Sequence, residues 1–375
     1  MIRMTALRFT LAGLLAPLAF GANYLMYVGT YTGGNKSKGI YAFKWDTATG
    51  QASPLGLAAE TPNPSFVTIH HNHKYLYAVG EGQGSGTVTA FAIDATSGKL
   101  KQLNTVSSHG TSPCHLNVDK TGKNLLVVNY GNGSTSVFPI NADGSLKEAS
   151  SVIQHKGSSV NQRQQGPHAH SVNMSADNRF AVVADLGLDE VLVYKFDPNS
   201  GTITPNEPPF TKVAPGSGPR HFAFHPKGRN AYVINEIALT VTAFKWDAKK
   251  GVLTETQTIS TLPPGFNGSR RGLSTAEVVV HPSGKFVYGS NRGHDTIAVF
   301  QVKGDQLEYV ENVATQGKTP RNFVIDPSGQ FLLAENSGTD NVVIFKIDQT
   351  TGKLTPTGTK FEVGSPVCIR FMPMK

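Results

Sequence analysis

A unit of about fifty residues recurs along this 375-residue chain, and such a repeat restricts the fold to architectures built from successive similar units. Each copy holds an apolar strand that starts at a proline, a turn such as HPKG or DPSG, a second apolar strand ending in Asn, Asp or Glu, and a third ending in F-x-x-D. The similarity is plain between PRHFAFHPKGRNAYVINE and PRNFVIDPSGQFLLAEN. The copies start at Pro64, Pro113, Pro167, Pro219, Thr275, Pro320 and Pro366.

The repeat predicts an all-β fold, a seven-bladed β-propeller. A G-x-L turn after the third strand, as in SGKL or KGVL, predicts a fourth strand, and four short antiparallel strands per repeat are typical of a propeller blade. The last copy, PVCIRFMP, has room for one strand, whereas the N-terminal NYLMYVGTYT and GIYAFKWD have no preceding anchor. We therefore expect the two chain ends to share one blade and close the ring. A stack of β-hairpin solenoid repeats is the structural alternative.

The first twenty-one residues, MIRMTALRFTLAGLLAPLAFG, are typical of a secretory signal peptide. Two arginines precede an apolar run that is short and proline-broken for a membrane span and ends at small residues. We therefore predict a signal over 1–21, one propeller domain over 22–375, and a periplasmic or secreted mature chain. A cytoplasmic protein with a buried N-terminal segment is the alternative.

The charge and the cysteines narrow the class of partner. The formal net charge is +8, but no basic run occurs, so we expect no nucleic-acid partner and favour a small anionic ligand. Two cysteines, Cys114 and Cys368, are too few for a disulfide framework and are expected to be buried thiols. A closed ring leaves no sheet edge for a partner to cover, so we predict a monomer.

Polar residues stand at corresponding corners of several repeats. In an antiparallel blade, the start of the first strand and the end of the second lie at the same edge of the sheet. Arg220 and Glu236, which are symmetric about Gly228, should therefore be neighbours at the central channel. The same mirror relation pairs His168 and His170 with Asp185, Glu277 with Arg292, Arg321 with Glu335 and Asn336, and His115 with Asn129.

Structural roles compete with functional ones at these corners. Arginine and glutamate across a turn can form a plain ion pair, and Asp185, Asn129 and Asn336 suit turns. His225 and His281 occupy the opposite turn of their repeats and are expected to be structural.

A shared functional site remains the stronger interpretation. His168 and His170 alternate on a strand and could ligate one metal ion, but nearby arginines oppose a cation, so we predict neither a metal nor another cofactor. A cluster of His, Arg and Glu at one mouth costs desolvation unless a ligand binds there.

Six stretches carry a family resemblance: YVGTYT, GPHAHSV, DLGLDEVLVY, GPRHFAFHPKGRNAYVINE, SNRGHDTIAVF and NFVIDPSGQFLLAEN. In them the chain resembles the seven-bladed propeller lactonase family, which includes 6-phosphogluconolactonases and, more distantly, carboxymuconate lactonising enzymes. The resemblance implies hydrolysis or formation of a lactone on one propeller face without a nucleotide cofactor. For the lactonising enzymes it implies a site of one histidine, two arginines and a glutamate, which correspond here to a histidine of GPHAH, Arg220, Glu236 and Arg292.

The residue types suit the opening of a sugar lactone by water. We predict that His168 or Glu236 is the general base, that Arg220 stabilises the oxyanion, and that Arg292 and Arg321 hold an anionic group. The predicted catalytic set is His168, Arg220, Glu236 and Arg292, and the predicted substrate-binding set is His170, Arg321, Glu277 and Asp185.

The predicted function is a lactonase of the 6-phosphogluconolactonase type, acting on a small anionic lactone. A muconate-type lactonising isomerase and a non-catalytic exported ligand-binding propeller are the alternatives. Because 6-phosphogluconolactone is a cytosolic metabolite of the pentose phosphate pathway, an exported chain leaves a different lactone open.

Overall fold

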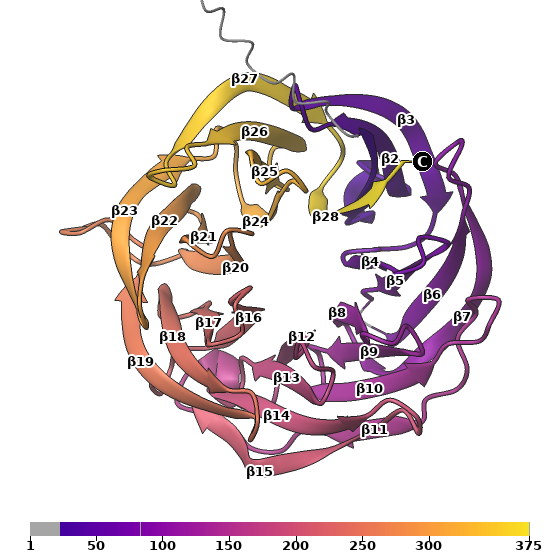
Figure 1. Cartoon of the computed structure of the whole chain (residues 1–375), viewed down its shortest axis with the longest axis horizontal. Coiled ribbons are helices and arrows are strands. Elements are labelled where there is room, and N and C mark those ends of the chain that lie inside the picture. The colour runs from indigo at the N-terminus through magenta and orange to yellow at the C-terminus, as the bar shows by residue number, and fades with distance from the viewer. Residues whose placement is uncertain (1–22, 83, 375) are drawn as a thin grey trace, which may run out of the picture.

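The computed structural model describes residues 23–82 and 84–374, and most of them lie in β-strands. In this part of the chain, seven four-stranded antiparallel sheets surround a central axis (Figure 1). The predicted seven-bladed propeller is therefore confirmed. The predicted signal peptide over 1–21 lies outside the described residues.

Six blades follow one another along the chain, each from the channel outward except where noted. They are β4 (Val67–Ile69), β5 (Tyr75–Gly80), β6 (Ser85–Ile93) and β7 (Leu100–Thr111); β8 (Pro113–Val118), β9 (Asn124–Asn129), β10 (Ser134–Pro139) and β11 (Ser151–Gln154); β12 (Ala169–Met174), β13 (Phe180–Asp185), β14 (Glu190–Asp197) and β15 (Thr202–Lys212); β16 (Pro219–Phe224), β17 (Asn230–Asn235), β18 (Thr240–Asp247) and β19 (Val252–Ser260); β20 (Ser274–Val280), β21 (Phe286–Arg292), β22 (Thr296–Lys303) and β23 (Gln306–Ala314); β24 (Pro320–Ile325), β25 (Phe331–Asn336), β26 (Asn341–Ile347) and β27 (Leu354–Glu362).

The seventh blade joins the two ends of the chain. It consists of β28 (Pro366–Pro373), β1 (Asn23–Thr30), β2 (Gly39–Asp46) and β3 (Gln51–Glu60), in that order from the channel outward. β28 pairs antiparallel with β1, and Figure 1 shows this yellow strand among the indigo ones. The predicted closure by shared terminal strands is confirmed.

The middle strands are apolar on both faces because each blade packs between two others. Every residue of β13, β17 and β25 is buried. Between the blades, side chains from neighbouring sheets interlock, as Val182, Phe222 and Trp246 do in one cluster. The core is therefore a ring of layers between blades, and it leaves the axis to polar side chains.

A β-bulge recurs in the innermost strands. In β16, Pro219 pairs with Asn235 and His221 with Ile234, so that Arg220 is the extra residue. Bulges redirect side chains and are common beside functional sites. Corresponding register shifts occur in five other inner strands, at Cys114, His170, Ala276–Glu277, Arg321 and Val367.

Histidines link neighbouring blades at the rim opposite these bulges. His225 Nε2 lies 2.9 Å from the carbonyl oxygen of Gly284, and His281 Nε2 lies 2.8 Å from that of Gly329. Their predicted structural role is confirmed. Each bond joins one blade's inner turn to the next.

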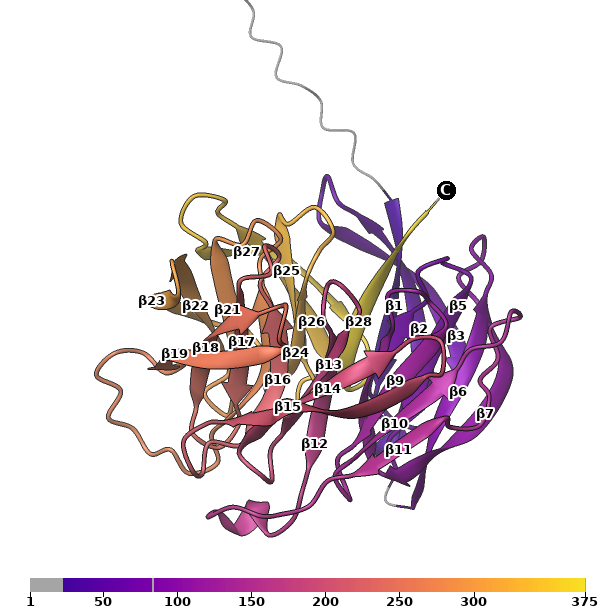
Figure 2. The same cartoon turned by 60° about the horizontal axis from the view of Figure 1, so that its bottom comes forward.

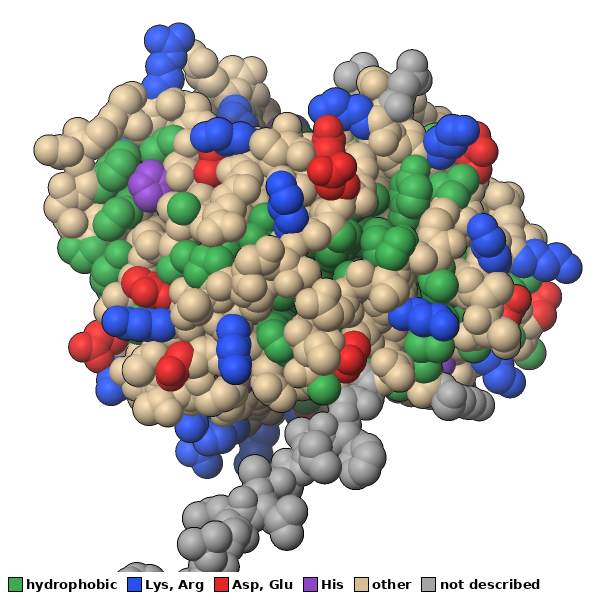
Figure 3. All heavy atoms as spheres, turned by 90° about the horizontal axis from the view of Figure 1, so that it is seen from above, with side chains coloured by type: hydrophobic (Ala, Val, Ile, Leu, Met, Phe, Trp, Pro, Cys, Tyr) green, Lys and Arg blue, Asp and Glu red, His purple; other side chains and the backbone are tan. Residues whose placement is uncertain are grey.

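Two short 3-10 helices, η1 (Gly33–Asn35) and η2 (Gln162–Gln164), interrupt the strands. Figure 2 shows the loop with η2 projecting from one face of the ring, and the C-terminus at the other face. Figure 3 shows basic and acidic side chains interspersed over the side of the ring that it displays. Within residues 23–82 and 84–374, no helix is long and apolar enough to cross a membrane.

Candidate active site

Two positions of the blades supply the side chains around the channel mouth. The first is the bulge residue of the innermost strand, and the second lies at or just after the end of the next strand. In the β16 blade these are Arg220 and Glu236, and the Glu236 backbone N–H donates to the Gly218 carbonyl at 2.7 Å. The second position is occupied in other blades by Tyr31, Glu81, Tyr130 and Arg292.

A cavity of about 290 Å³ opens at this mouth. Arg163, Arg292 and Arg321 line it together with the carboxylates of Glu81 and Glu236. Tyr31, Tyr130, Cys114 and His170 complete its wall. Its inner end narrows to a niche of about 10 Å³, which shares four lining residues with the cavity: Glu81, Cys114, His170 and Arg321.

Three guanidinium groups surround Glu236. Its Oε2 lies 2.8 Å from Arg220 Nε and 2.9 Å from Arg292 Nη2, and its Oε1 lies 2.5 Å from Arg163 Nη2. Burial alone would raise the pKa of Glu236, but Arg292, Arg220 and Arg163 outweigh it and hold that pKa at about 2. This carboxylate therefore orients the arginines, and its placement does not suit the predicted role as general base.

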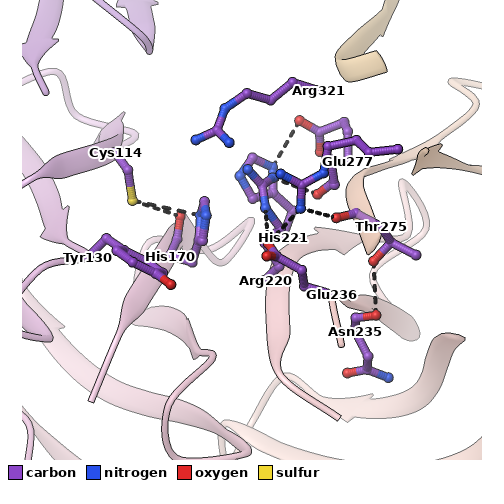
Figure 4. A network of polar contacts seen from close by, with 12 residues as sticks. Cys114, Tyr130, His170, Arg220, His221, Asn235, Glu236, Thr275, Glu277 and Arg321 are labelled. Carbon is purple, nitrogen blue, oxygen red and sulfur yellow. Dashed lines mark hydrogen bonds and ion pairs between the residues drawn. The ribbon is translucent and has the colours of Figure 1, made fainter. Parts of the chain in front are cut away.

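Arg220 is paired on one side of its guanidinium and free on the other. The side chain is 2% exposed, Nε binds Glu236, and Nη1 donates to the Ala276 carbonyl at 2.7 Å (Figure 4). Its Nη2 has no hydrogen-bond partner among the described residues, and Arg220 lines the niche. A forked, permanently charged donor is thus held rigidly with one donor to spare.

Arg292 binds across to the neighbouring blade. Besides Glu236, its Nη2 donates to the Thr275 carbonyl at 2.6 Å. Burial lowers its pKa to about 10, which leaves the group charged at neutral pH. The predicted pair of Arg292 with Glu277 is therefore wrong.

Glu277 lies deeper in the channel than predicted. The bulge in β20 shifts the register, and Glu277 Oε2 lies 2.9 Å from His221 Nδ1 and 2.8 Å from Asn322 Nδ2. The carboxylate does not line the cavity or the niche. A direct contact with substrate is thus not supported by its position.

Arg321 faces the cavity from the opposite wall. Its guanidinium lies 5.1 Å from the centre of the Tyr31 ring, and Nη2 is 3.9 Å from Glu81 Oε1. Burial opposes the charge, but Tyr31 and Glu81 outweigh it and raise the pKa of Arg321. The predicted pairing with Glu335 and Asn336 is wrong, because the bulge turns Arg321 out of the sheet register.

The pair predicted for His115 and Asn129 is also displaced by a bulge. Pro113 takes the place opposite Asn129, whose Nδ2 donates to the Ser108 carbonyl at 3.1 Å. The His115 ring lies in the channel, 4.1 Å from the Phe66 ring between centroids. Asn129 is thus structural, as its residue type suggested.

The histidine of GPHAHS that enters the cavity is His170. The repeat was predicted to start at Pro167, but Ala169 pairs with Asp185, and His170 occupies the bulge position that Arg220 has in the next blade. It is buried and lines both the cavity and the niche. Burial, followed by the nearby arginines, lowers the pKa of His170 well below its usual range, so the ring is neutral near pH 7.

His168 and Asp185 lie beside the cavity and not in its wall. The His168 ring stacks on Tyr130 at 4.6 Å, and its Nδ1 lies 2.8 Å from the Tyr130 carbonyl oxygen. The fully buried Asp185 accepts from the His168 backbone N–H at 2.7 Å and binds His155 Nδ1 at 2.7 Å. Their positions suit support of the wall, against the predicted catalytic and substrate-binding roles.

Sequence reasoning missed several wall residues. Glu81 and Tyr31 occupy the strand-end position of Glu236, so the mirror relation applied to the Pro64 repeat would have found Glu81. Arg163 comes from the loop between β11 and β12, which no repeat covers.

The site is rich in cationic donors. Four guanidinium groups meet two carboxylates around the cavity and its niche. In the part of the chain that the structure describes, no group of three or more His, Cys, Asp or Glu side chains could hold a metal ion. Cys114 and Cys368 are buried and unpaired, as expected. The geometry is suited to holding an anion and polarising a carbonyl group.

Fold and site together define a seven-bladed propeller with an arginine-lined axial pocket. The chain belongs to the seven-bladed β-propeller lactonase family, whose model matches residues 25–371.

Named relatives match nearly the whole chain. A 6-phosphogluconolactonase of Bacillus subtilis (strain 168) is 40% identical over 351 residues, which cover 93% of this chain and 98% of that protein. A 6-phosphogluconolactonase of Formosa agariphila is 36% identical over 307 residues, covering 79% and 85%. The solved structure of a periplasmic gluconolactonase of Pseudomonas aeruginosa superposes with a TM-score of 0.88 at 34% identity, covering 94% of this chain and 100% of that one.

Proposed function

We propose that this chain hydrolyses a sugar-acid lactone that carries a phosphate or carboxylate group, as in the 6-phosphogluconolactonases to which it is similar. The observation that carries the proposal is the excess of arginine over carboxylate around a cavity of about 290 Å³. A cavity of this size and charge accommodates a small anionic sugar derivative.

The arginines divide the work by position. Arg163, Arg292 and Arg321 line the outer cavity, where bidentate donors hold phosphate or carboxylate oxygens. Arg220 lies at the inner niche, and its unpaired Nη2 is the donor for the oxyanion that develops on the lactone carbonyl. His170, neutral and beside both groups, fits a contact with the lactone ring.

We also propose that the protein acts outside the cytoplasm as a single propeller domain over 22–375. The signal-like segment at 1–21 and the likeness to a periplasmic gluconolactonase support this location. Mass measurement of the purified mature N-terminus tests it, because retention of the first residues would contradict export.

The substrate class can be tested with freshly dissolved lactones and the purified mature chain. We expect ring opening above the spontaneous rate for glucono-lactone, and a higher kcat/KM for its 6-phosphate because the arginines contribute binding. Replacing Arg321 with Gln should raise KM for the phosphorylated lactone by about 10-fold or more, with a smaller effect on the uncharged one.

Arg229→Gln is the matched control, because Arg229 is exposed at the opposite rim. The proposal fails if neither lactone opens faster than in buffer. Rapid turnover of muconolactones alone would assign the isomerase function instead.

A further inference from the structure

A buried histidine–carboxylate pair lies at the inner niche. His221 follows Arg220 in β16, is 4% exposed, and places Nδ1 2.9 Å from Glu277 Oε2 (Figure 4). The carboxylate is itself fixed, since Oε2 accepts from Asn322 Nδ2 at 2.8 Å and Oε1 from the Val278 backbone N–H at 2.9 Å. An ionised carboxylate can only accept, so Nδ1 of His221 carries the proton.

The second nitrogen of His221 is left open. Its Nε2 makes no hydrogen bond with any of the described residues, and His221 lines the niche together with Arg220 and Arg321. The niche measures about 10 Å³, close to the smallest volume that holds one water molecule. An unprotonated nitrogen, a space for water and an unpaired arginine donor thus meet at the inner end of the cavity.

We propose that His221, positioned by Glu277, is the general base that activates the attacking water; this inference rests on the proposed lactonase function. The water oxygen forms a bond to the lactone carbonyl carbon while one of its protons passes to His221 Nε2. The carbonyl becomes an oxyanion that Arg220 Nη2 stabilises. When the intermediate collapses, the ring C–O bond breaks, the leaving oxygen takes the proton from Nε2, and the new acid ionises to solvent.

The other proton acceptors of the site are less suited to this step. Both oxygens of Glu236 are bound by arginines. His170 has no carboxylate partner, and its Nδ1 lies 3.7 Å from the weakly interacting Cys114 Sγ. Glu81 accepts from the Tyr31 hydroxyl at 2.8 Å and lies within reach of Arg321, which its charge helps to position.

The electrostatics give the pair a pH dependence. Burial raises the pKa of Glu277 to about 7 against the pull of arginines, and burial also lowers the pKa of His221 well below its usual range. Above pH 7 the pair is a carboxylate beside a neutral imidazole with Nε2 free. Below it Glu277 binds a proton, donates it towards Nδ1, and forces the imidazole hydrogen onto Nε2. The groups that face the pair are Arg220, Arg321, Arg370, His115, His170 and Glu335.

The test compares His221→Gln and Glu277→Gln with the wild type on the lactone that the wild type opens fastest. His221→Gln should lower kcat by about 100-fold or more, with KM changed only a few-fold. Glu277 is a positioning residue, so Glu277→Gln should lower kcat by about 10-fold or more and abolish the rise of kcat/KM with pH near 7 that we expect of the wild type.

His225→Gln, in the turn after the same strand, is the matched control and should keep the wild-type kcat. If His221→Gln is unfolded by circular dichroism, the near-isosteric Glu277→Gln variant decides through its pH profile. A His221→Gln enzyme with wild-type kcat, or an unchanged pH profile in Glu277→Gln, overturns the assignment. A wild type that opens no lactone overturns the proposed function instead, which separates the two failures.

Discussion

At the residue scale, Glu236 makes the arginine cluster possible. Arg163, Arg220 and Arg292 carry like charges at close range, and two of these side chains are largely buried. Without the shared carboxylate, their repulsion and desolvation would be uncompensated. The low pKa of Glu236, about 2, reflects this coupling, which makes the residue as much a part of folding as of function.

Replacing Glu236 with Gln should therefore destabilise the protein at neutral pH. Because the folded-state pKa lies below the unfolded one, the ionised group stabilises the fold above its ordinary pKa and loses that effect as pH falls towards 2. We expect a loss of roughly 3 kcal/mol at pH 7 that shrinks by pH 3, measured by urea unfolding. The exposed Glu308→Gln should change little; an equally harmless Glu236→Gln would refute the coupling.

The sequence was informative about residues wherever symmetry alone sets the neighbourhood. Arg220 and Glu236 are equidistant from their turn, and the structure joins them at 2.8 Å. The same reasoning misplaced Arg321 and Glu277, because a bulge inserts one residue and redirects the side chain without changing the apolar pattern. It also exchanged His168 for His170, since Pro167 looked like an anchor but Ala169 fills that position.

At the element scale, the loop between β11 and β12 completes the cavity. Asn161 and Gln164 form a capping box around η2, and the buried Gln164 side chain donates to the Leu186 carbonyl at 2.8 Å and to Asp189 Oδ1 at 2.8 Å. These bonds place Arg163 over Glu236. The blade strands were predictable from their repeated pattern, whereas this loop was not, because its contacts depend on the finished ring.

Arg163→Ala should weaken substrate binding more than chemistry. The side chain is 47% exposed and lies at the outer cavity, so we expect KM to rise about 3- to 10-fold with kcat nearly unchanged. Gln164→Ala should act in the same direction by loosening the loop. Steady-state kinetics beside Arg179→Ala, an exposed arginine at the other rim, checks this; a large fall in kcat would place Arg163 in the reaction step instead.

At the scale of the whole molecule, the site exists only when the ring is closed. Tyr31, Glu81, Tyr130, Glu236 and Arg321 come from five different blades, and β28 brings the last blade into place against β1. Each blade contributes one or two side chains at equivalent positions. Convergence at the axis turns a repeated structural corner into an arginine-lined cavity, which the repeat and its polar corners predicted in outline.

The most direct measurement of this account is the rate at which wild type and Arg220→Lys open a freshly dissolved phosphorylated aldonolactone at neutral pH, corrected for spontaneous opening. Lysine keeps the charge beside Glu236 but cannot hold that carboxylate and also present a second fixed donor at the niche. The account predicts wild-type opening well above the spontaneous rate and a kcat at least about 100-fold lower in the folded variant. A variant with near-wild-type kcat, or a wild type no faster than buffer, would contradict it.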